Sequence, residues 1–406
     1  MSLVVQKFGG SSLETPGKLM SAARRIIAEA EAGNETVVVV SAQGDDTDEL
    51  IARAKEIDPE PDRRELDMLM AVGEQMSIAL TAIAIHTLGH DAVSLTGAQA
   101  GIRTDAESSK ARIQAVDTTR VRQELEQGRI VIVAGFQGVD SDDNITTLGR
   151  GGSDTTAVAL AVSLGAERCE IFTDVEGIHT ADPSIVSNAR KLDVLDFGEL
   201  LELASLGAGV MHSRAVEIAE RFNQPFRVRP SFNESEGSLV KNIQEEVEQV
   251  DVRGATLEEK EAKLTIRDVE DRPGIASTIF HRVSEQGINV DMIVQNVSEH
   301  GATDLSFTVD RSDLPRAVEV LETLSHELGA GAVEADEDIS KLSVVGVGMR
   351  SHHGVAEKMF HALAAHEVNI DMISTSEIKI SCIIGSEQGS EALRAVHDAF
   401  ELGEQE

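Results

Sequence analysis

LVVQKFGGSS, residues 3–12, is an apolar run that ends in a glycine-rich turn, and three further runs of this kind follow it. They are TVVVVSA (36–42), RIVIVAGF (129–136) and CEIFTDV (169–175). Each is nearly continuous in apolar residues and rich in valine or isoleucine, as is typical of strands buried on both faces. Amphipathic stretches such as KLMSAARRIIAEAEAG (18–33) lie between the runs and predict helices. The alternation predicts an α/β fold with a mostly parallel sheet.

The sequence changes character after about residue 240. Residues 242–264 are acidic and polar, which suggests a domain boundary with one hairpin, and an internal repeat follows. DRPGIASTIFHRVSEQGINVDMIVQN (271–296) aligns without a gap with SHHGVAEKMFHALAAHEVNIDMISTS (351–376), at an offset of 80 residues. Each copy predicts a strand, a turn at Gly274 or Gly354, a helix and two strands. We therefore expect an N-terminal domain over 1–245 and two βαββ modules, over 263–337 and 340–402, that form a regulatory tail.

The composition narrows the class of protein. The 406 residues include 71 acidic and 36 basic side chains, a net charge of −35, which argues against nucleic acid or an anionic membrane as a partner. No apolar run approaches the roughly 20 residues that span a bilayer, and no signal peptide precedes the first strand. Cys169 and Cys382 are the only cysteines, and no spacing resembles a metal site. We expect a cytoplasmic protein, either an ordinary acidic one or one adapted to high salt.

The turn KFGGSS (7–12) is suited to binding phosphate. Gly9 and Gly10 let the backbone approach a ligand closely, successive N–H groups can surround an anion, and Lys7 adds a positive charge. The alternative is an ordinary strand-to-helix turn with a solvated lysine. Neither a Walker A motif nor a G-x-G-x-x-G turn is present, which argues against a P-loop NTPase and a Rossmann dehydrogenase.

TTLGRGGSDTTA (146–157) is a more specific signal, because it combines three glycines, an arginine, an aspartate and several hydroxyls before an apolar helix. The N-terminus of that helix favours an anion, and Arg150 offers a planar fork for a carboxylate or phosphate. Ser153 or Asp154 could simply cap the helix. A plain cap needs neither Arg150 nor the glycine pair, so the motif favours a binding site.

FTDVEGIHTADP (172–183) begins in another predicted strand. Ligands of parallel sheets bind beyond the carboxyl ends of the strands. Thr173, Asp174 and Asp182 are therefore placed to meet a ribose, phosphates or a metal ion, although an acidic surface loop would read the same way.

Taken together, these motifs resemble those of the aspartate kinases. They occur in the family's order, with VVSAQGDDTDEL (39–50), GEQMS (73–77), TGAQAGIRT (96–104), VAGFQG (133–138), ELLELASLGAGVMHSRAVE (199–217) and RVRPSF (227–232) among them. The two repeats resemble paired ACT domains. The resemblance covers essentially the whole chain and implies a three-layer α/β/α amino acid kinase domain followed by two ACT domains.

The resemblance also implies roles for the matching residues. Lys7 and Asp154 would be catalytic. The residues expected to hold L-aspartate are Thr47, Glu74, Arg150, Gly151, Gly152 and Ser153. Those expected to hold ATP, with Mg²⁺, are Lys7, Phe8, Gly9, Gly10, Ser41, Thr173, Asp174, His179, Asp182 and Pro183.

Four positions depart from the family pattern. Phe172 and His179 stand where the family often has tyrosine, and Glu176 where it often has aspartate. Ser184 stands where an arginine commonly follows the Asp-Pro pair, so one positive group expected near ATP is missing. Lys7 and Arg150 remain, and activity is still expected.

The implied reaction is phosphorylation of the aspartate β-carboxylate by ATP, the first step toward lysine, threonine and methionine. One alternative is a kinase of the same family that acts on glutamate, acetylglutamate or UMP. Another is a catalytically silent amino-acid sensor. The intact Lys7, Glu74, Arg150 and Asp154 argue against the sensor, which could lose them freely.

The first repeat predicts an amino-acid site. A helix N-terminus favours a carboxylate, and acidic or amide side chains nearby can meet an ammonium. The residues expected to be regulatory are Asp271, Gly274, Ile275, Ala276, Asn289, Asp291, Gln295 and Asn296. The inhibitor would be lysine, threonine or both, in a homo-oligomer paired through the ACT domains. The alternative is that the ACT pair only joins subunits.

Overall fold

The computed structural model describes residues 2–205, 211–243, 251–295, 301–347 and 354–403, which fall into two compact units. Unit 1 comprises Met1–His179, Lys191–Ser205 and Gly209–Glu245. Unit 2 comprises Thr180–Arg190, Leu206–Ala208 and Glu246–Glu406. The short segment Thr180–Arg190 thus belongs to unit 2, although its sequence neighbours on both sides belong to unit 1.

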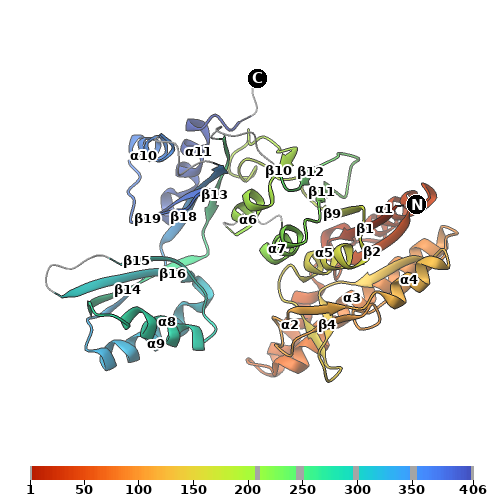
Figure 1. Ribbon diagram of the computed structural model, residues 1–406, viewed down its shortest axis with the longest axis horizontal. Coiled ribbons are helices and arrows are strands. Elements are labelled where there is room, and N and C mark those ends of the chain that lie inside the picture. The colour runs from red at the N-terminus through yellow and green to blue at the C-terminus, as the bar shows by residue number, and fades with distance from the viewer. Residues whose placement is uncertain (1, 206–210, 244–250, 296–300, 348–353, 404–406) are drawn as a thin grey trace. The chain divides into compact units, whose positions relative to one another are not determined.

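Unit 1 is built on an eight-stranded sheet with the order β10-β12-β11-β9-β1-β2-β6-β3 (Figure 1). The six strands from β11 to β3 are parallel, while β12 and β10 run against them, which confirms the mostly parallel sheet. The strands are β1 (Leu3–Phe8), β2 (Glu35–Val40), β3 (Ala92–Leu95), β6 (Ile130–Ala134), β9 (Arg168–Thr173), β10 (Val194–Leu195), β11 (Phe226–Pro230) and β12 (Ser238–Val240).

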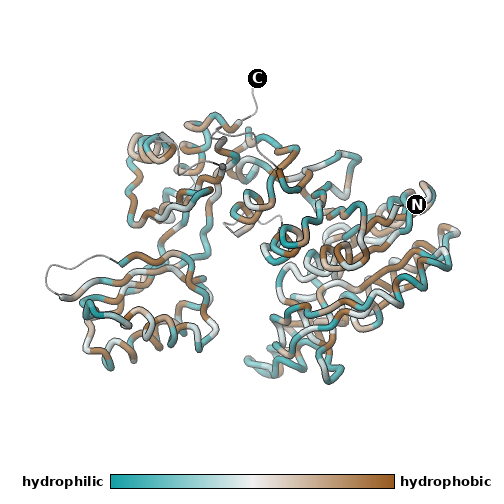
Figure 2. Tube along the Cα trace, in the orientation of Figure 1, coloured by the Kyte–Doolittle hydropathy of each residue, from teal (hydrophilic) through white to brown (hydrophobic). Residues whose placement is uncertain are grey.

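Helices cover both faces of this sheet and make three layers. α1 (Pro16–Glu31) and α3 (Arg63–Thr87) share one apolar cluster with β1, β2 and β6, and the strands stand out as apolar in Figure 2. On the other side α5 (Gly152–Leu164) is buried along nearly its whole length. The remaining helices of the unit are α2 (Asp46–Ile57), α4 (Thr119–Glu126), α6 (Phe197–Ser205) and α7 (Ser213–Arg221).

Within the described ranges, α3 is the one helix long and apolar enough to cross a membrane by length and composition, and 56% of its apolar window is buried inside the protein. A core helix passes the same test, and α3 packs against α1 and the sheet. A second sheet of unit 1, in the order β5-β4-β7-β8, lies before α5 in the chain. It consists of β4 (Ile102–Thr104), β5 (Ile113–Val116), β7 (Gln137–Val139) and β8 (Ile145–Thr147).

Unit 2 contains two modules, each with a four-stranded antiparallel sheet and two helices. The first has the sheet order β15-β16-β14-β17 and the second β13-β18-β20-β19. The first module comprises β14 (Glu261–Glu270), α8 (Ile275–Glu285), β15 (Val290–Gln295), β16 (Ala302–Asp310), α9 (Leu314–Leu328) and β17 (Val333–Asp336). The second comprises β13 (Asp251–Glu258), β18 (Ile339–Val347), α10 (Val355–Ala365), β19 (Met372–Thr375), β20 (Lys379–Gly385) and α11 (Gly389–Ala399).

Each module is therefore larger than the βαββ pattern read from the repeat, because a second helix and a fourth strand complete it. In the first module these are α9 and β17. In the second, the fourth strand is β13, which precedes the first module in sequence and pairs antiparallel with β18. The first module is thus inserted into the second.

Candidate active site

The carboxyl end of β1 and the N-terminal turn of α5 bring two charged side chains together. Lys7 Nζ lies 2.6 Å from Asp154 Oδ1, and each side chain is only 11% exposed. Lys7 is the next-to-last residue of β1, and Asp154 lies in the first turn of α5. The motifs KFGGSS and GGSD, far apart in sequence, therefore share one site.

The turn after β1 depends on glycine. A Cβ atom on Gly10 would lie 2.6 Å from the carbonyl oxygen of Ala42, so no other residue fits without a shift of backbone. The N–H of Gly44 donates to Gly10 O at 3.2 Å, and that of Ser41 donates to Phe8 O at 3.1 Å. These contacts hold the loop that follows β2 directly against the turn.

The glycine pair before α5 is also a packing requirement. Gly151 has φ 69°, and a Cβ there would lie 2.2 Å from Cβ of His212. A Cβ on Gly152 would lie 2.9 Å from side-chain atoms of Leu148 and Phe136. The loop is thus pressed against its neighbours, while the Arg150 side chain is exposed to solvent.

Glu74 places a second carboxylate near this site. It lies on α3, is 3% exposed, and its Oε1 accepts the Ala42 N–H at 3.0 Å. Burial raises the pKa of Glu74 to about 7, and the Ala42 hydrogen bond opposes that rise. Oε2 is buried and has no hydrogen-bond partner among the described residues. Gly73 allows this approach, because a Cβ there would lie 2.7 Å from Cβ of Ala42 and 3.8 Å from Oγ1 of Thr47.

Asp67 holds the strand that leads into the Arg150 loop, a role that was not predicted from the sequence. Its carboxylate is fully buried and accepts hydrogen bonds from Ser109 N and from Thr147 N and Oγ1, at 2.6 to 3.1 Å. Thr147 ends β8 just before the Arg150 loop. The available signal was the spacing of Asp67 and Glu74, two acidic residues seven apart, and hence on one face of an apolar helix.

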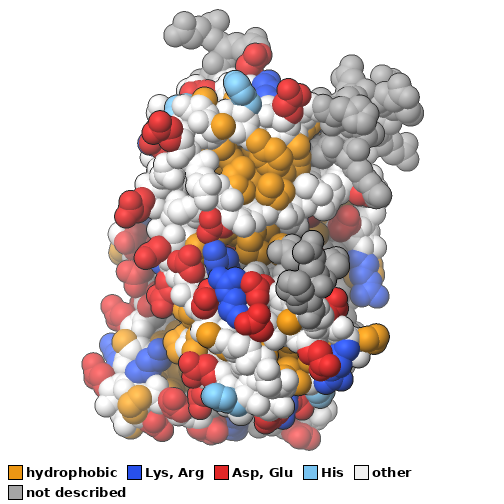
Figure 3. Space-filling model, turned by 90° about the vertical axis from the view of Figure 1, so that its left-hand side faces the viewer, with side chains coloured by type: hydrophobic (Ala, Val, Ile, Leu, Met, Phe, Trp, Pro, Cys, Tyr) orange, Lys and Arg blue, Asp and Glu red, His pale blue; other side chains and the backbone are white. Residues whose placement is uncertain are grey.

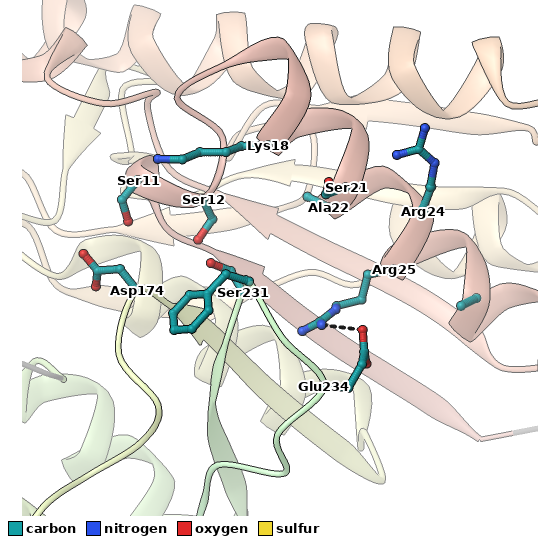
Figure 4. Close-up of a pocket in the computed structure, with 12 residues that line it drawn as sticks. Ser11, Ser12, Lys18, Ser21, Ala22, Arg24, Arg25, Asp174, Ser231 and Glu234 are labelled. Atoms are coloured by element: carbon teal, nitrogen blue, oxygen red, sulfur yellow. Dashed lines mark hydrogen bonds and ion pairs between the residues drawn. The ribbon is translucent and has the colours of Figure 1, made fainter.

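A pocket of about 680 Å³ opens beside the β1 turn (Figure 4). Ser11 and Ser12 line it from the turn, Asp174 from the end of β9, and Ser231 and Phe232 from the β11–β12 loop. Two predicted nucleotide segments therefore meet at one cavity. Ser231 and Phe232 were not predicted, although RVRPSF was among the motifs noted.

Basic residues of α1 complete the pocket, which Lys18, Arg24 and Arg25 also line. Arg25 donates to Pro230 O at 2.9 Å and pairs with Glu234 at 2.8 Å, so it fixes the β11–β12 loop to α1. The guanidinium of Arg25 lies over the ring of Phe172, 4.8 Å from the ring centroid. Phe172 is one of the residues that stand where the family often has tyrosine.

The remaining predicted nucleotide residues lie farther along the chain. His179 pairs with Lys191 in an isolated antiparallel bridge. Asp182 and Pro183 belong to unit 2, where Asp182 Oδ1 accepts hydrogen bonds from N and Oγ of Ser184 at 2.8 and 2.7 Å. The structure thus gives the carboxylate of Asp182 a local partner in the residue that replaces the usual arginine.

The predicted regulatory residues lie in the first module of unit 2. Gly274, at φ 94°, precedes the first residue of α8, and Ile275 and Ala276 form its first turn. Asp271 is exposed in the β14–α8 loop, Asn289 in the α8–β15 loop, and Gln295 at the end of β15. Asp291 pairs with Lys341 Nζ at 2.5 Å. Asn296 lies outside the described residues.

The comparisons with known proteins agree with this architecture. Residues 2–230 match the amino acid kinase family, and residues 264–326 and 342–400 match ACT domains. The aspartokinase of Pseudomonas aeruginosa is 50% identical over 404 residues, which cover 99% of this chain and 98% of that protein. The aspartokinase of Corynebacterium glutamicum is 48% identical over 408 residues, covering 99% and 97%.

Solved structures give the same result. E. coli aspartokinase III in complex with aspartate and ADP superposes with a TM-score of 0.85 at 25% identity, covering 98% of this chain and 99% of that one. The aspartate kinase from Synechocystis is 40% identical, with a TM-score of 0.56, and the match covers 100% of this chain and 70% of that one.

Proposed function

The chain belongs to the aspartokinases, ATP-dependent enzymes of the amino acid kinase family, and on that premise we propose how its residues transfer the γ-phosphoryl group of ATP to the β-carboxylate of L-aspartate. The observation that carries the proposal is the Lys7–Asp154 ion pair at 2.6 Å, beside a turn in which only glycine fits at position 10. It puts a fixed positive charge and a close backbone approach at one point, as phosphoryl transfer requires.

In this mechanism a β-carboxylate oxygen attacks the γ-phosphorus as the bond from that phosphorus to the β–γ bridging oxygen breaks. The products are the acyl phosphate and ADP. A carboxylate is already ionised at neutral pH, so the enzyme needs no general base. Lys7 stabilises the charge on the transferred group, and Asp154 holds Lys7 in place. Catalysis then rests on positioning two anions and neutralising the charge between them.

In this proposal the two loops around Ala42 and Gly151 bind aspartate. The guanidinium of Arg150 is exposed and free to turn toward a carboxylate of the substrate, for which a planar fork is suited. Glu74 Oε2, buried without a partner among the described residues, would receive the α-ammonium, with Thr47 nearby. Gly151, Gly152 and Ser153 would offer backbone at the N-terminus of α5.

The pocket beside the β1 turn fits a nucleotide. Its volume of about 680 Å³ is in the range of small-molecule sites, and it carries positive charge from α1. Phe232, 61% exposed on its rim, offers a ring against which a base could stack. Phe8, Gly9, Gly10 and Ser41 would lie at the phosphates, and Thr173, Asp174 and His179 toward the ribose and base. Asp182 and Pro183 fit this site less well, because Ser184 already engages Asp182.

The donor set for Mg²⁺ is consistent with a metal that arrives with the nucleotide. The described residues include no group of three or more acidic, histidine or cysteine side chains that could hold a metal ion. Such sites commonly use one or two carboxylates plus the phosphates. Two exposed carboxylates line the pocket, Asp174 and Glu234, and Glu234 is paired with Arg25, which leaves Asp174 as the candidate. When bound, Mg²⁺ would neutralise phosphate charge.

We also propose feedback inhibition by lysine, threonine or both in a homo-oligomeric, cytoplasmic enzyme. A related structure, E. coli aspartokinase III, was solved with lysine and aspartate. Ile293 and Ile373 are equivalent in the two modules, stand 53% and 46% exposed, and lie on the edge strands β15 and β19. Exposed apolar edges favour pairing with another chain, and apolar side chains gather among acidic ones on the face of Figure 3.

An aspartate-dependent hydroxamate assay tests the proposed reaction. Acyl phosphate formed from aspartate and ATP traps as the hydroxamate, and ADP is released in equal amount. Hydroxamate or ADP formed only with glutamate, acetylglutamate or UMP would assign another acceptor. Binding of amino acids without turnover would assign a silent sensor. Inhibition of wild type by millimolar lysine or threonine, weakened in Gln295→Ala, tests the regulation.

A further inference from the structure

The chain from Ile178 to Leu192, here called the arm, leaves unit 1, enters unit 2 and returns. Its stem is a short antiparallel pair. Leu192 N donates to Ile178 O at 2.8 Å, Thr180 N donates to Arg190 O at 2.9 Å, and His179 and Lys191 pair between them. The chain therefore passes from unit 1 to unit 2 and back through two segments that pair with each other on both sides of the crossing.

The base of the arm is fixed next to the pocket loop. Ile178 N donates to Ser238 Oγ at 2.9 Å, and Lys191 Nζ donates to Gly237 O at 3.3 Å. Ile178 follows Asp174 by only four residues, and Asp174 lines the pocket. A displacement of the stem would therefore also displace the loop that follows β9, which includes Asp174.

The tip of the arm is part of the core of the second ACT module. Ala181, Val186 and Ala189 are buried in the same apolar cluster as the helices α10 and α11. Arg394 on α11 donates to Ile185 O at 3.4 Å, and Ala189 pairs with Gly403 as a bridge. Close packing of this kind does not deform continuously, so the tip must follow α11.

The buried hydroxyl of Thr180 connects the arm to α11 and to the segment after it, and is called the joint here. Thr180 Oγ1 lies 2.9 Å from His397 Nε2 on α11, 3.1 Å from Leu402 O and 3.0 Å from Arg190 N. Both Thr180 and His397 are fully buried. The hydroxyl is fully satisfied when it donates to Leu402 O and accepts from Arg190 N–H and from His397 Nε2–H. His397 is then the neutral Nε2–H tautomer, in keeping with its buried Nδ1, which has no hydrogen-bond partner among the described residues.

We propose that Thr180 and His397 are positioning residues that couple the second ACT module to the nucleotide pocket. The inference rests on the proposed function, since it takes the pocket as the ATP site. His397 touches no reacting atom. His397 holds Thr180 in place by a hydrogen bond. Thr180 adjoins His179 in the stem, and the base of the stem is hydrogen-bonded next to the segment 174–178, which includes the pocket residue Asp174. The Thr180 hydroxyl has all its hydrogen bonds made within this buried cluster, and loss of any of them would leave a buried polar group unpaired, which suits the cluster to transmit a shift.

Kinetics of two hydroxyl deletions provide the first test. Thr180→Val keeps the branched shape and removes the joint, and we expect the KM for ATP to rise at least fivefold while that for aspartate stays within twofold. Ser343→Ala is the matched control, because it removes a buried hydroxyl bonded to Ser381 at 2.7 Å in the same module, on the face of β18 opposite to Leu342 and Val344, which share the apolar cluster of the arm. Equal effects of the two variants on the KM for ATP would overturn the proposal.

Hydrogen exchange provides the second test and does not need turnover. Coupling is reciprocal, so ADP bound to wild type should slow exchange in residues 389–403 at least threefold. His397→Gln, whose amide N–H can replace Nε2–H, should keep that protection, and His397→Leu should lose it. If His397→Leu keeps the protection, or if wild type binds ADP without gaining it, the coupling is rejected and the proposed function is not affected. No ADP binding by wild type would reject the proposed function instead.

Discussion

Glu261 of the first ACT module and Lys341 of the second form a buried ion pair, and the 80-residue offset of the repeat relates one to the other. The same offset relates Asp291 to Asp371. Lys341 holds Asp291 at 2.5 Å, and Lys263 of the first module holds Asp371 at 2.8 Å. Each module therefore supplies a lysine that pairs with an aspartate of the other module. Asp291, expected to meet the ammonium of an effector, already faces an ammonium of its own chain.

Loss of Lys341 should destabilise unit 2 strongly. Lys341→Met leaves Glu261 buried without a counter-charge, and breaking a buried pair in this way costs about 3–5 kcal/mol. Lys263→Met is the matched control, since its partner Asp371 is 36% exposed, and such pairs contribute less than about 1 kcal/mol. Calorimetry of the unit 2 transition measures both. Equal melting temperatures for the two variants would contradict the account.

Lys7→Ala should lower kcat by about 10³ or more, because a positive group at the transferred phosphoryl is lost. The KM for aspartate should change far less. Lys55→Ala, at an exposed position on α2, controls for loss of a lysine in general. Steady-state assays of ADP release compare the three proteins, and wild-type kcat in Lys7→Ala would rule out the catalytic role.

The affinity for aspartate should depend on pH through Glu74. Burial raises the pKa of Glu74 to about 7 in the free enzyme, so the carboxyl is increasingly neutral below that pH and attracts an ammonium less. The KM for aspartate should therefore rise as pH falls from 8 to 6, by up to about tenfold per pH unit. The β-carboxyl of aspartate does not titrate in this range.

Glu74→Gln is the informative comparison for that profile. It should have a raised KM for aspartate at pH 8 and a flat profile down to pH 6, because the titrating group is gone. A wild-type slope that persists unchanged in Glu74→Gln would assign the pH dependence to another residue.

Adaptation to high salt would appear in thermal stability. A net charge of −35 implies self-repulsion within the fold, which counterions screen. If the surface is adapted to salt, the melting temperature should rise from low to molar KCl. A flat or falling melting temperature would leave an ordinary acidic enzyme.

The family resemblance named Lys7 and Asp154 together as catalytic residues, and Lys7 does lie against Asp154. Strand order alone could not bring their motifs together, because KFGGSS follows β1 of the parallel sheet whereas GGSD follows β8 of the second sheet. Patterns could not reveal the partner of Asp291. That residue reads as an exposed acid at the start of a strand, and Lys341 reads as one lysine in another strand.

The excursion of Thr180–Arg190 into unit 2 was equally hidden. Asp182 and Pro183 sit in a motif shared with nucleotide segments, and nothing local shows that Ala181, Val186 and Ala189 fill a distant core. Long-range packing decided that placement. The role of Asp67 was missed for the same reason, since its partners Ser109 and Thr147 are remote in sequence.

The insertion of one ACT module within the other sets an order of events during synthesis. β13 emerges from the ribosome before β14, yet its partner β18 emerges only after the first module is complete. The first module can close from local contacts, whereas the second must wait for a non-local pairing, which is slow. Until then β13 is an unpaired strand beside a folded neighbour, and this is the interval in which a nascent chain is most exposed to misassembly.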